Sequence, residues 1–265
     1  MATAIINDAE LYYEVQGKGV PLLLLAGLTS GAQSWQPVVK DLAKHCLVIT
    51  LDSRGMGRTK SADPATNIKQ MADDCFGLIR HLGFSSVNLL GHALGGFVGQ
   101  NCAIRYPGIV DKLILTAVAA RNSARNNALF ADWASCLESG IDLDLWFRNL
   151  FYWVLSRRFF ENEAAVRQAV RLAVEHFHPQ SKASFRNQVR AAAKFDGSAR
   201  LSRISSKTLV LCGKEDLLFP PDECAQLAAA IPGASLVVID NAAHSIHMEN
   251  PRPFVERILD FLYPR

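Results

Sequence analysis

Short apolar segments alternate with longer segments of helical periodicity over the first 116 residues. Two short runs near the N-terminus, Ala4–Ile6 and Leu11–Val15, predict an opening β-hairpin. Apolar runs that suit strands buried on both faces of a sheet follow at Pro21–Ala26, Cys46–Leu51, Val87–Leu90 and Leu113–Thr116. Helical patterns lie between them at Gln36–Leu42, Ile68–Leu82 and Leu94–Tyr106. This order is typical of an α/β fold with a mainly parallel sheet flanked by helices.

The alternation stops after Thr116, and residues 120–203 show only helical periodicity. Strand patterns resume at Thr208–Cys212 and Leu236–Ile239, and an amphipathic helix is predicted over Pro253–Phe261. We therefore expect one core, formed by residues 1–119 and 204–265. A helical lid formed by residues 120–203 is inserted in it.

Composition narrows the class of protein. The chain has 265 residues, of which 49% are hydrophobic and 20% charged, as in a soluble globular domain. A net charge of +3 gives no reason to expect a nucleic-acid partner. The six cysteines show no CxxC spacing, which argues against a zinc site or a disulfide framework. The longest apolar run, Val20–Leu28, is too short for a bilayer, and the N-terminus lacks a signal-peptide pattern. We expect a cytoplasmic protein without a membrane, metal or cofactor requirement.

The strongest chemical signal is the run Gly91-His92-Ala93-Leu94-Gly95-Gly96, between a predicted strand and a predicted helix. A nucleophile elbow is a sharp turn of this kind, in which small flanking residues expose one side chain above the sheet. The usual pattern is G-x-S-x-G. Here Ala93 occupies the nucleophile position and has no nucleophilic atom.

Two further side chains follow in the order that a catalytic triad on this fold requires. Asp216 lies just after the strand Thr208–Cys212, and His244 lies just after Leu236–Ile239. Ligands bind beyond the carboxyl ends of strands in open α/β sheets. The order and the positions together indicate an acid and a base.

The chain resembles the α/β-hydrolase superfamily over nearly its whole length. The likeness is carried by the elbow and by four runs, Leu24–Leu28 continuing to Trp35, Asp52–Thr59, Leu209–Asp216 and Ala243–Pro251. It implies that Asp216 is the triad acid and His244 the base. It also implies that the backbone N–H groups of Leu28 and Leu94 form the oxyanion hole. The superfamily usually has His-Gly where this chain has Ala26-Gly27, but a backbone donor does not depend on that side chain.

Two positions leave alternatives. His247 is a rival for the base, although the family pattern favours His244 and gives His247 a place in the pocket or in packing. Ala93 indicates either a serine enzyme silenced by a Ser-to-Ala replacement or a natural chain that binds a ligand without turnover. An acid, a base and an oxyanion loop would serve little purpose in a binder, so we favour the silenced enzyme.

The predicted lid suggests how a substrate is recognised. Residues 121–203 contain 13 basic and 8 acidic side chains. Some of the lid arginines would bind an anionic substrate. The alternative is that they are solvent-exposed charges on a helical face. The candidates are Arg121, Arg125, Arg148, Arg157 and Arg158. Aromatic side chains would form the pocket wall or pack the lid on the core, among them Trp133, Trp146, Trp153, Phe147, Phe151 and Tyr152.

We expect a carboxylic ester or lactone hydrolase that works through an acyl-enzyme. Small acidic lactones, as for 3-oxoadipate enol-lactone hydrolases, and esters on an acyl carrier protein, as for pimeloyl-carrier methyl esterases, stay open as substrates. The alternative is a non-catalytic ligand sensor on the same fold.

Overall fold

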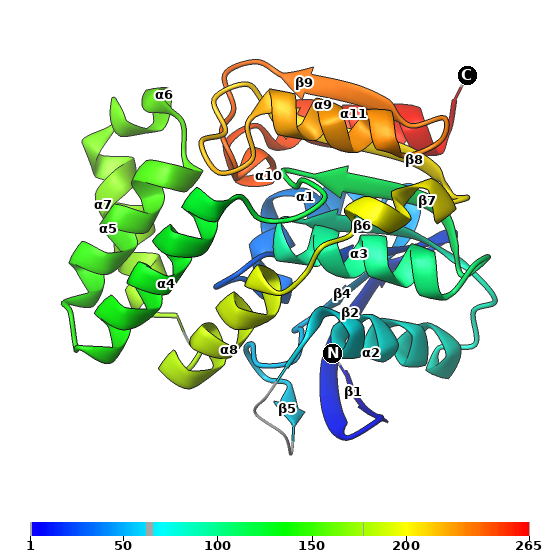
Figure 1. Cartoon of the computed structure of the whole chain (residues 1–265), viewed down its shortest axis with the longest axis horizontal. Coiled ribbons are helices and arrows are strands. Elements are labelled where there is room, and N and C mark those ends of the chain that lie inside the picture. Colours follow the sequence, from blue (N-terminus) through cyan, green and yellow to red (C-terminus); the bar gives the residue numbers. More distant parts are fainter. Residues whose placement is uncertain (1, 62–65, 177, 265) are drawn as a thin grey trace.

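A single mixed sheet forms the centre of the molecule (Figure 1). The computed structural model describes residues 2–61, 66–176 and 178–264. Among these residues the strand order is β1-β2-β4-β3-β6-β7-β8-β9, with the short β5 beside β2. The pairs from β4 to β9 are parallel, and β1, β2 and β5 pair antiparallel. The strands are β1 (Ala2–Ile6), β2 (Ala9–Gly17), β3 (Val20–Leu25), β4 (Cys46–Leu51), β5 (Lys60–Ser61), β6 (Val87–His92), β7 (Val110–Thr116), β8 (Lys207–Gly213) and β9 (Ser235–Ile239).

Helices cover both faces of this sheet. The helices are α1 (Gln36–Leu42), α2 (Ile68–His81), α3 (Leu94–Arg105), α4 (Ala124–Glu138), α5 (Leu143–Val154), α6 (Arg157–Phe160), α7 (Glu163–Val174), α8 (Lys182–Ala193), α9 (Pro221–Ala230), α10 (Ile246–Glu249) and α11 (Pro251–Leu262), with 3-10 turns η1 (Ala32–Trp35) and η2 (Ser198–Arg203). The predicted α/β architecture is confirmed. Helices α9 and α10 were not predicted.

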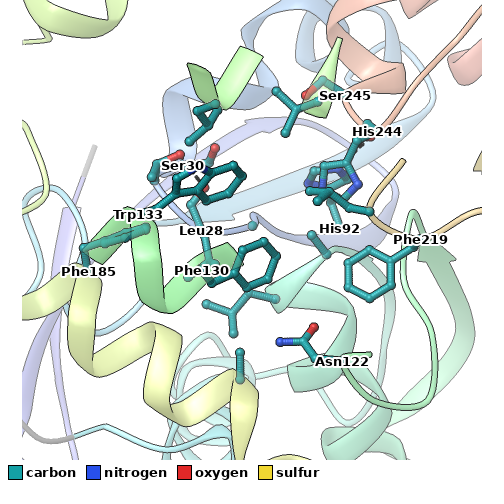
Figure 2. Close-up of a pocket in the computed structure, with 18 of the residues that line it drawn as sticks. Leu28, Ser30, His92, Asn122, Phe130, Trp133, Phe185, Phe219, His244 and Ser245 are labelled. Carbon is teal, nitrogen blue, oxygen red and sulfur yellow. Dashed lines mark hydrogen bonds between the residues drawn. The ribbon is translucent and has the colours of Figure 1, made fainter. Parts of the chain in front are cut away.

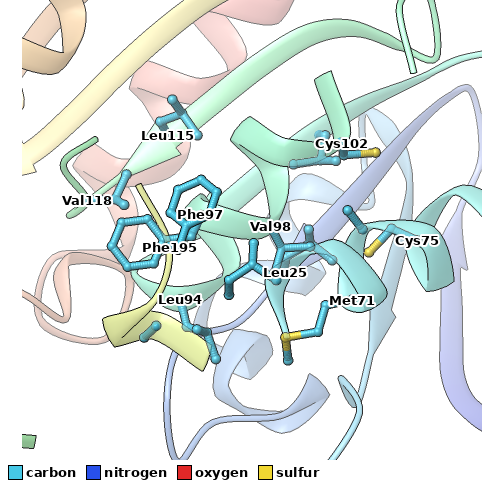
Figure 3. Close-up of a cluster of buried hydrophobic side chains, with 14 of the residues drawn as sticks. Leu25, Met71, Cys75, Leu94, Phe97, Val98, Cys102, Leu115, Val118 and Phe195 are labelled. Carbon is cyan, nitrogen blue, oxygen red and sulfur yellow. The ribbon is translucent and has the colours of Figure 1, made fainter. Parts of the chain in front are cut away.

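The leucine run in β3 explains the two-sided burial. Leu23 and Leu25 pack into a cluster with α2, α3 and α9, whereas Leu22 and Leu24 pack into a second cluster with α1 and α11. Successive side chains of a strand point to opposite faces, so a continuous apolar run suits a strand covered on both sides. Figure 3 shows part of the first cluster, where Leu25 meets Val98 of α3 and Met71 of α2.

Helices α4–α8 lie between β7 and β8 in the chain and form a separate group at one end of the sheet (Figure 1). Hydrogen bonds attach this helical insertion to the rest of the chain. The Asn126 side chain donates to the carbonyl of Leu218, and the Gln188 side chain donates to the carbonyl of Arg54. The N–H of Ser245 donates to the carbonyl of Val154. Within the described ranges we find no helix long and apolar enough to cross a membrane.

Candidate active site

The turn from β6 to α3 has the geometry of a nucleophile elbow. Ala93 has φ 50° and ψ −115°, a region that non-glycine residues rarely adopt. A Cβ on Gly91 would overlap the carbonyl of Gly95, and a Cβ on Gly95 would overlap the carbonyl of Leu25. The two glycines are therefore required by close backbone packing, as the motif predicts. The turn places the Ala93 methyl group in the lining of a cavity.

The structure brings Asp216 and His244 together. Nδ1 of His244 lies 3.0 Å from Oδ2 of Asp216, and both side chains are almost fully buried. The other carboxylate oxygen of Asp216 accepts from the N–H groups of Leu218 at 2.8 Å and Phe219 at 3.0 Å. A carboxylate held on three sides orients the imidazole, and its acceptor character places the proton of His244 on Nδ1. Nε2 is then the nitrogen with a free lone pair.

Two more buried histidines lie beside His244. The rings of His92 and His244 are 4.7 Å apart, and those of His92 and His247 are 4.8 Å apart. Nε2 of His92 lies 3.0 Å from the carbonyl oxygen of His244, so this nitrogen carries the proton. Burial, with the neighbouring histidines, lowers the pKa of His92 well below its usual value. Burial also lowers the pKa of His247 to about 3.

His247 packs away from the cavity. Its ring lies 4.6 Å from that of Trp35 and also contacts Phe254. It does not line the cavity and neither of its nitrogens has a hydrogen-bond partner in the described part of the chain. Of the two alternatives, the structure therefore pairs His244 with the acid.

The segment after β3 carries the predicted first oxyanion donor. Leu28 lines the cavity, and so does Leu94, whose N–H is free of intrahelical bonding because it begins α3. A Cβ on Gly27 would lie 3.1 Å from the Cβ of Ala93, so this segment passes directly over the elbow.

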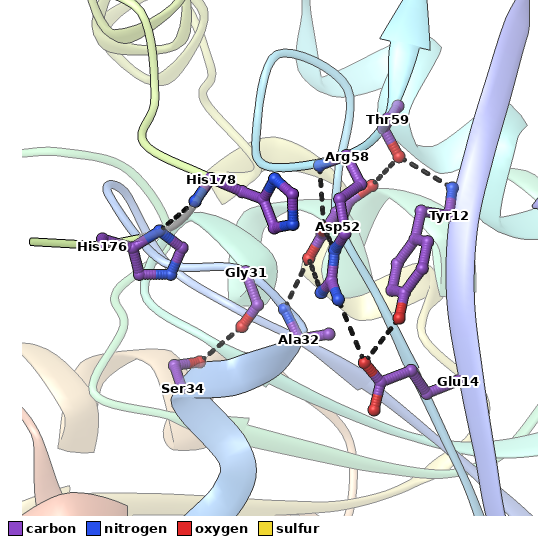
Figure 4. Close-up of polar contacts among 10 residues, drawn as sticks. All are labelled: Tyr12, Glu14, Gly31, Ala32, Ser34, Asp52, Arg58, Thr59, His176 and His178. Carbon is purple, nitrogen blue, oxygen red and sulfur yellow. Dashed lines mark hydrogen bonds and ion pairs between the residues drawn. The ribbon is translucent and has the colours of Figure 1, made fainter. Parts of the chain in front are cut away.

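Asp52 fixes the end of the same segment (Figure 4). Its carboxylate accepts from the N–H of Ala32 at 2.8 Å and from the N–H of Arg58 at 3.0 Å, and it pairs with Nε of Arg58 at 2.8 Å. Arg54 instead pairs with Asp74. The Asp52–Thr59 loop thus has a structural role, since Asp52 and Arg54 both form buried contacts within the fold.

A cavity of about 100 Å³ lies above the elbow. The polar side chains in its lining are those of Thr29, Ser30, His92, Asn122, His244 and Ser245. Figure 2 shows Asn122 at one side of the cavity and His244 with Ser245 at another. Apolar side chains form most of the rest, namely Leu28, Leu94, Phe97, Phe130, Trp133, Leu150, Phe151, Val154, Phe185, Ala192, Leu218, Phe219 and Met248. None of the described lining residues is Lys, Arg, Asp or Glu.

The predicted lid residues divide into two groups. Trp133 lines the cavity and donates from Nε1 to the side chain of Asn149 at 2.9 Å. Trp146 is buried behind it and donates to the carbonyl of Trp133, whereas Trp153 lies outside the cavity beneath Arg125. The three arginines Arg148, Arg157 and Arg158 are exposed and do not line the cavity.

Sequence reasoning did not identify several lining residues. Asn122 follows β7, so its place beyond a strand end was the available signal. Phe130 and Phe185 come from α4 and α8, and their helical spacing did not indicate which face would meet the cavity.

Comparison with known proteins agrees with this fold. Residues 22–257 match the model of the Alpha/beta hydrolase family. The chain is 31% identical over 260 residues to a protein of Agrobacterium fabrum named "Putative carbamate hydrolase RutD", covering 96% of this chain and 98% of the relative. The crystal structure of the enol-lactonase from Burkholderia xenovorans LB400 has a TM-score of 0.89 at 25% identity, covering 98% of this chain and 99% of that one. A thermophilic esterase from Thermogutta terrifontis has a TM-score of 0.85 at 26% identity, covering 96% and 93%. The chain belongs to the alpha/beta hydrolase family.

Proposed function

We propose that this protein hydrolyses a small, uncharged carbonyl compound of the ester, lactone or carbamate class, with His244 as the base and Asp216 as its orienting acid. The 3.0 Å contact between these two side chains, at the edge of a cavity above the elbow, carries the proposal. The three compound classes come from the names of similar proteins, a carbamate hydrolase, an enol-lactonase and an esterase.

Position 93 determines the nucleophile. Ala93 offers no oxygen or sulfur atom, so His244 has water as its partner in this chain. Nε2 of His244 takes a proton from water while the water oxygen bonds to the carbonyl carbon. The N–H groups of Leu28 and Leu94 stabilise the oxyanion that forms. The carbon–heteroatom bond then breaks, and the leaving group takes the proton from His244.

A serine at position 93 would open the covalent route favoured by the sequence. His244 would then take the proton of the hydroxyl group, and an acyl-enzyme would form before water releases the acid. The elbow and the base suit both routes, so position 93 alone separates them.

The cavity favours an uncharged substrate over an anionic one. The described lining has no cationic side chain to compensate a carboxylate. Transfer of an unpaired charge into an apolar site costs several kcal/mol, on the order of what a good substrate gains by binding. An uncharged compound avoids this cost.

Four proteins test the proposal: the parent chain, Ala93→Ser, His244→Ala and the double variant. Hydrolysis of p-nitrophenyl acetate and of an N-methyl carbamate of p-nitrophenol is followed by absorbance. We expect slow turnover by the parent that His244→Ala removes. We expect Ala93→Ser to be at least about a hundredfold faster on the ester, since a triad nucleophile contributes up to about a millionfold.

Two other outcomes would reject part or all of this proposal. Equal rates for the parent and His244→Ala, with an active Ala93→Ser, would reject the water route and identify a silenced serine enzyme. A folded but inactive Ala93→Ser protein, together with an inactive parent, would reject hydrolysis and favour the ligand sensor.

A further inference from the structure

Asn122 is a buried amide that the fold does not use. It is 6% exposed, and neither Nδ2 nor Oδ1 has a hydrogen-bond partner among the residues that the structure describes. Among the described residues that line the cavity, Asn122 is the one with buried side-chain polar atoms left unpaired. Buried polar groups are nearly always paired, because an unpaired one gives up its hydrogen bonds to water and gains none in return. An unpaired amide at a cavity therefore indicates a function outside folding.

The backbone on both sides of Asn122 is held by hydrogen bonds. The carbonyl of Ala119 accepts from the side chain of Gln100 at 2.9 Å, and the carbonyl of Ala120 accepts from the N–H of Gly197 at 2.9 Å. On the other side, Ser123 caps α4. A fixed backbone on both sides holds Asn122 at the wall of the cavity.

The amide lies away from the acid–base pair. Figure 2 shows Asn122 at one side of the cavity and His244 with Ser245 at another, with the rings of Phe130 and Phe219 bordering the space between. A ligand with its carbonyl carbon near Ala93 would extend past these rings toward Asn122. The apolar walls of the cavity would contact the middle of this ligand, and the Asn122 amide would contact its end.

We infer that Asn122 selects the substrate by binding an uncharged group of the carboxamide type, which both donates and accepts hydrogen bonds. The amide side chain has a complementary donor and acceptor, and together they form a two-point contact. A carboxylate at the same place would satisfy only the Nδ2 donor and would bring a charge into apolar surroundings. This inference rests on the proposed function for the position of the reacting carbonyl.

Two ligands of equal shape test the inference by calorimetry. Methyl succinamate carries a terminal carboxamide, and methyl 4-methylpentanoate carries an isopropyl group in its place. Asn122→Leu should weaken binding of methyl succinamate about tenfold and should not weaken binding of methyl 4-methylpentanoate. Asn127→Leu is the matched control, because Oδ1 of Asn127 is also unpaired but Asn127 does not line this cavity. It should change neither affinity.

Thermal unfolding distinguishes a role of Asn122 in ligand selection from a role in stabilising the fold. Asn122→Leu should unfold at the same or a higher temperature, since an apolar side chain replaces two unpaired polar atoms. A lower unfolding temperature, or equal weakening of both ligands, would overturn the inference. Asn122→Ala repeats the test with a smaller side chain. Binding and turnover are measured separately. If Ala93→Ser protein is inactive but Asn122→Leu still weakens the binding of methyl succinamate alone, the proposed hydrolysis is rejected and the role of Asn122 in binding is not.

Discussion

At the scale of single residues, Ala93 keeps a backbone conformation that costs about 1–3 kcal/mol for a non-glycine residue. The close packing of Gly91 and Gly95 and the bond from the N–H of Ala93 to the carbonyl of Thr116 impose it. The side chain at 93 does not determine the elbow. Replacement by serine should therefore leave the turn intact. A change in the activity of Ala93→Ser protein then comes from the added hydroxyl group and not from a changed backbone.

Replacement of His244 and replacement of His247 should have very different effects on kcat in Ala93→Ser protein. In Ala93→Ser protein, His244→Ala should lower kcat on p-nitrophenyl acetate by at least about a thousandfold, because it removes the base. His247→Ala should lower kcat less than about tenfold, since His247 does not line the cavity and packs behind it against Trp35 and the lining residue His92. Steady-state kinetics on both variants gives the comparison. The opposite order of effects would show that His247 is the base.

His247 should also make the fold sensitive to acid. The pKa of an unfolded histidine is about 6.5, and burial lowers the pKa of His247 to about 3 in the fold. Between these values the unfolded chain binds a proton that the folded chain does not. The stability contributed by the neutral form is thus complete above pH 6.5 and is lost as the pH falls toward 3.

His247→Phe should remove this dependence. The loss of unfolding free energy between pH 7 and pH 5 should become smaller by about 2 kcal/mol in the variant, as measured by urea unfolding at both values. His81→Gln, which removes an exposed imidazole, serves as the control. An unchanged difference between the two pH values would contradict the expectation.

At the scale of elements, Asp52 joins two segments: it accepts from the N–H of Ala32 at the start of η1, and it binds the N–H and the guanidinium of Arg58 in the loop after β4. Asp52→Ala should lower the free energy of unfolding by about 2–3 kcal/mol, because it leaves buried donors unpaired beside a partly exposed arginine. In Ala93→Ser protein it should also lower kcat, since the segment with Leu28 loses its anchor. Asp52→Asn, which keeps the shape, should lose less. Unchanged unfolding in Asp52→Ala would show that the anchor is unimportant.

Elements with strong patterns were predictable from the sequence, and short ones were not. Strand Cys46–Leu51 and helix Gln36–Leu42 have the bounds that their apolar patterns predict. Helix α9 was missed, although Pro221 with Asp222 and Glu223 in its first turn is a recognisable helix start. Helix α10 has only four residues, too few for periodicity to appear.

The site was predictable where its residues follow strands. The places of Asp216 and His244 depend on strand ends, which sequence patterns locate well. The cavity wall depends on how α4 and α8 pack, and tertiary contacts fix that packing. For this reason Phe130 and Phe185 were missed, and tryptophans that pack behind the wall could not be told from those that form it.

At the scale of the whole molecule, the basic side chains of the insertion lie apart from the cavity of the candidate active site. The excess of basic residues in the insertion lies toward solvent, whereas the cavity is lined by uncharged and aromatic groups together with two histidines. Some of these arginines hold the insertion on the core. Arg157 pairs with Glu215 at 3.3 Å, and Arg125 donates to the carbonyl of Leu217. The insertion thus meets the core by polar contacts at its rim and by aromatic packing inside.

This separation leads to a prediction about substrate charge. Arg148→Gln, Arg157→Gln and Arg158→Gln should each change KM less than about twofold in Ala93→Ser protein, equally for an acidic and a neutral ester of the same length. An exposed arginine contributes under about 1 kcal/mol, and salt screens most of it. The Arg157 side chain is 91% exposed, so loss of its pair with Glu215 fits that range. Kinetics at low and high salt gives the test. A tenfold rise in KM for the acidic ester alone, at any one of the three, would mean that the insertion brings that arginine onto the bound substrate.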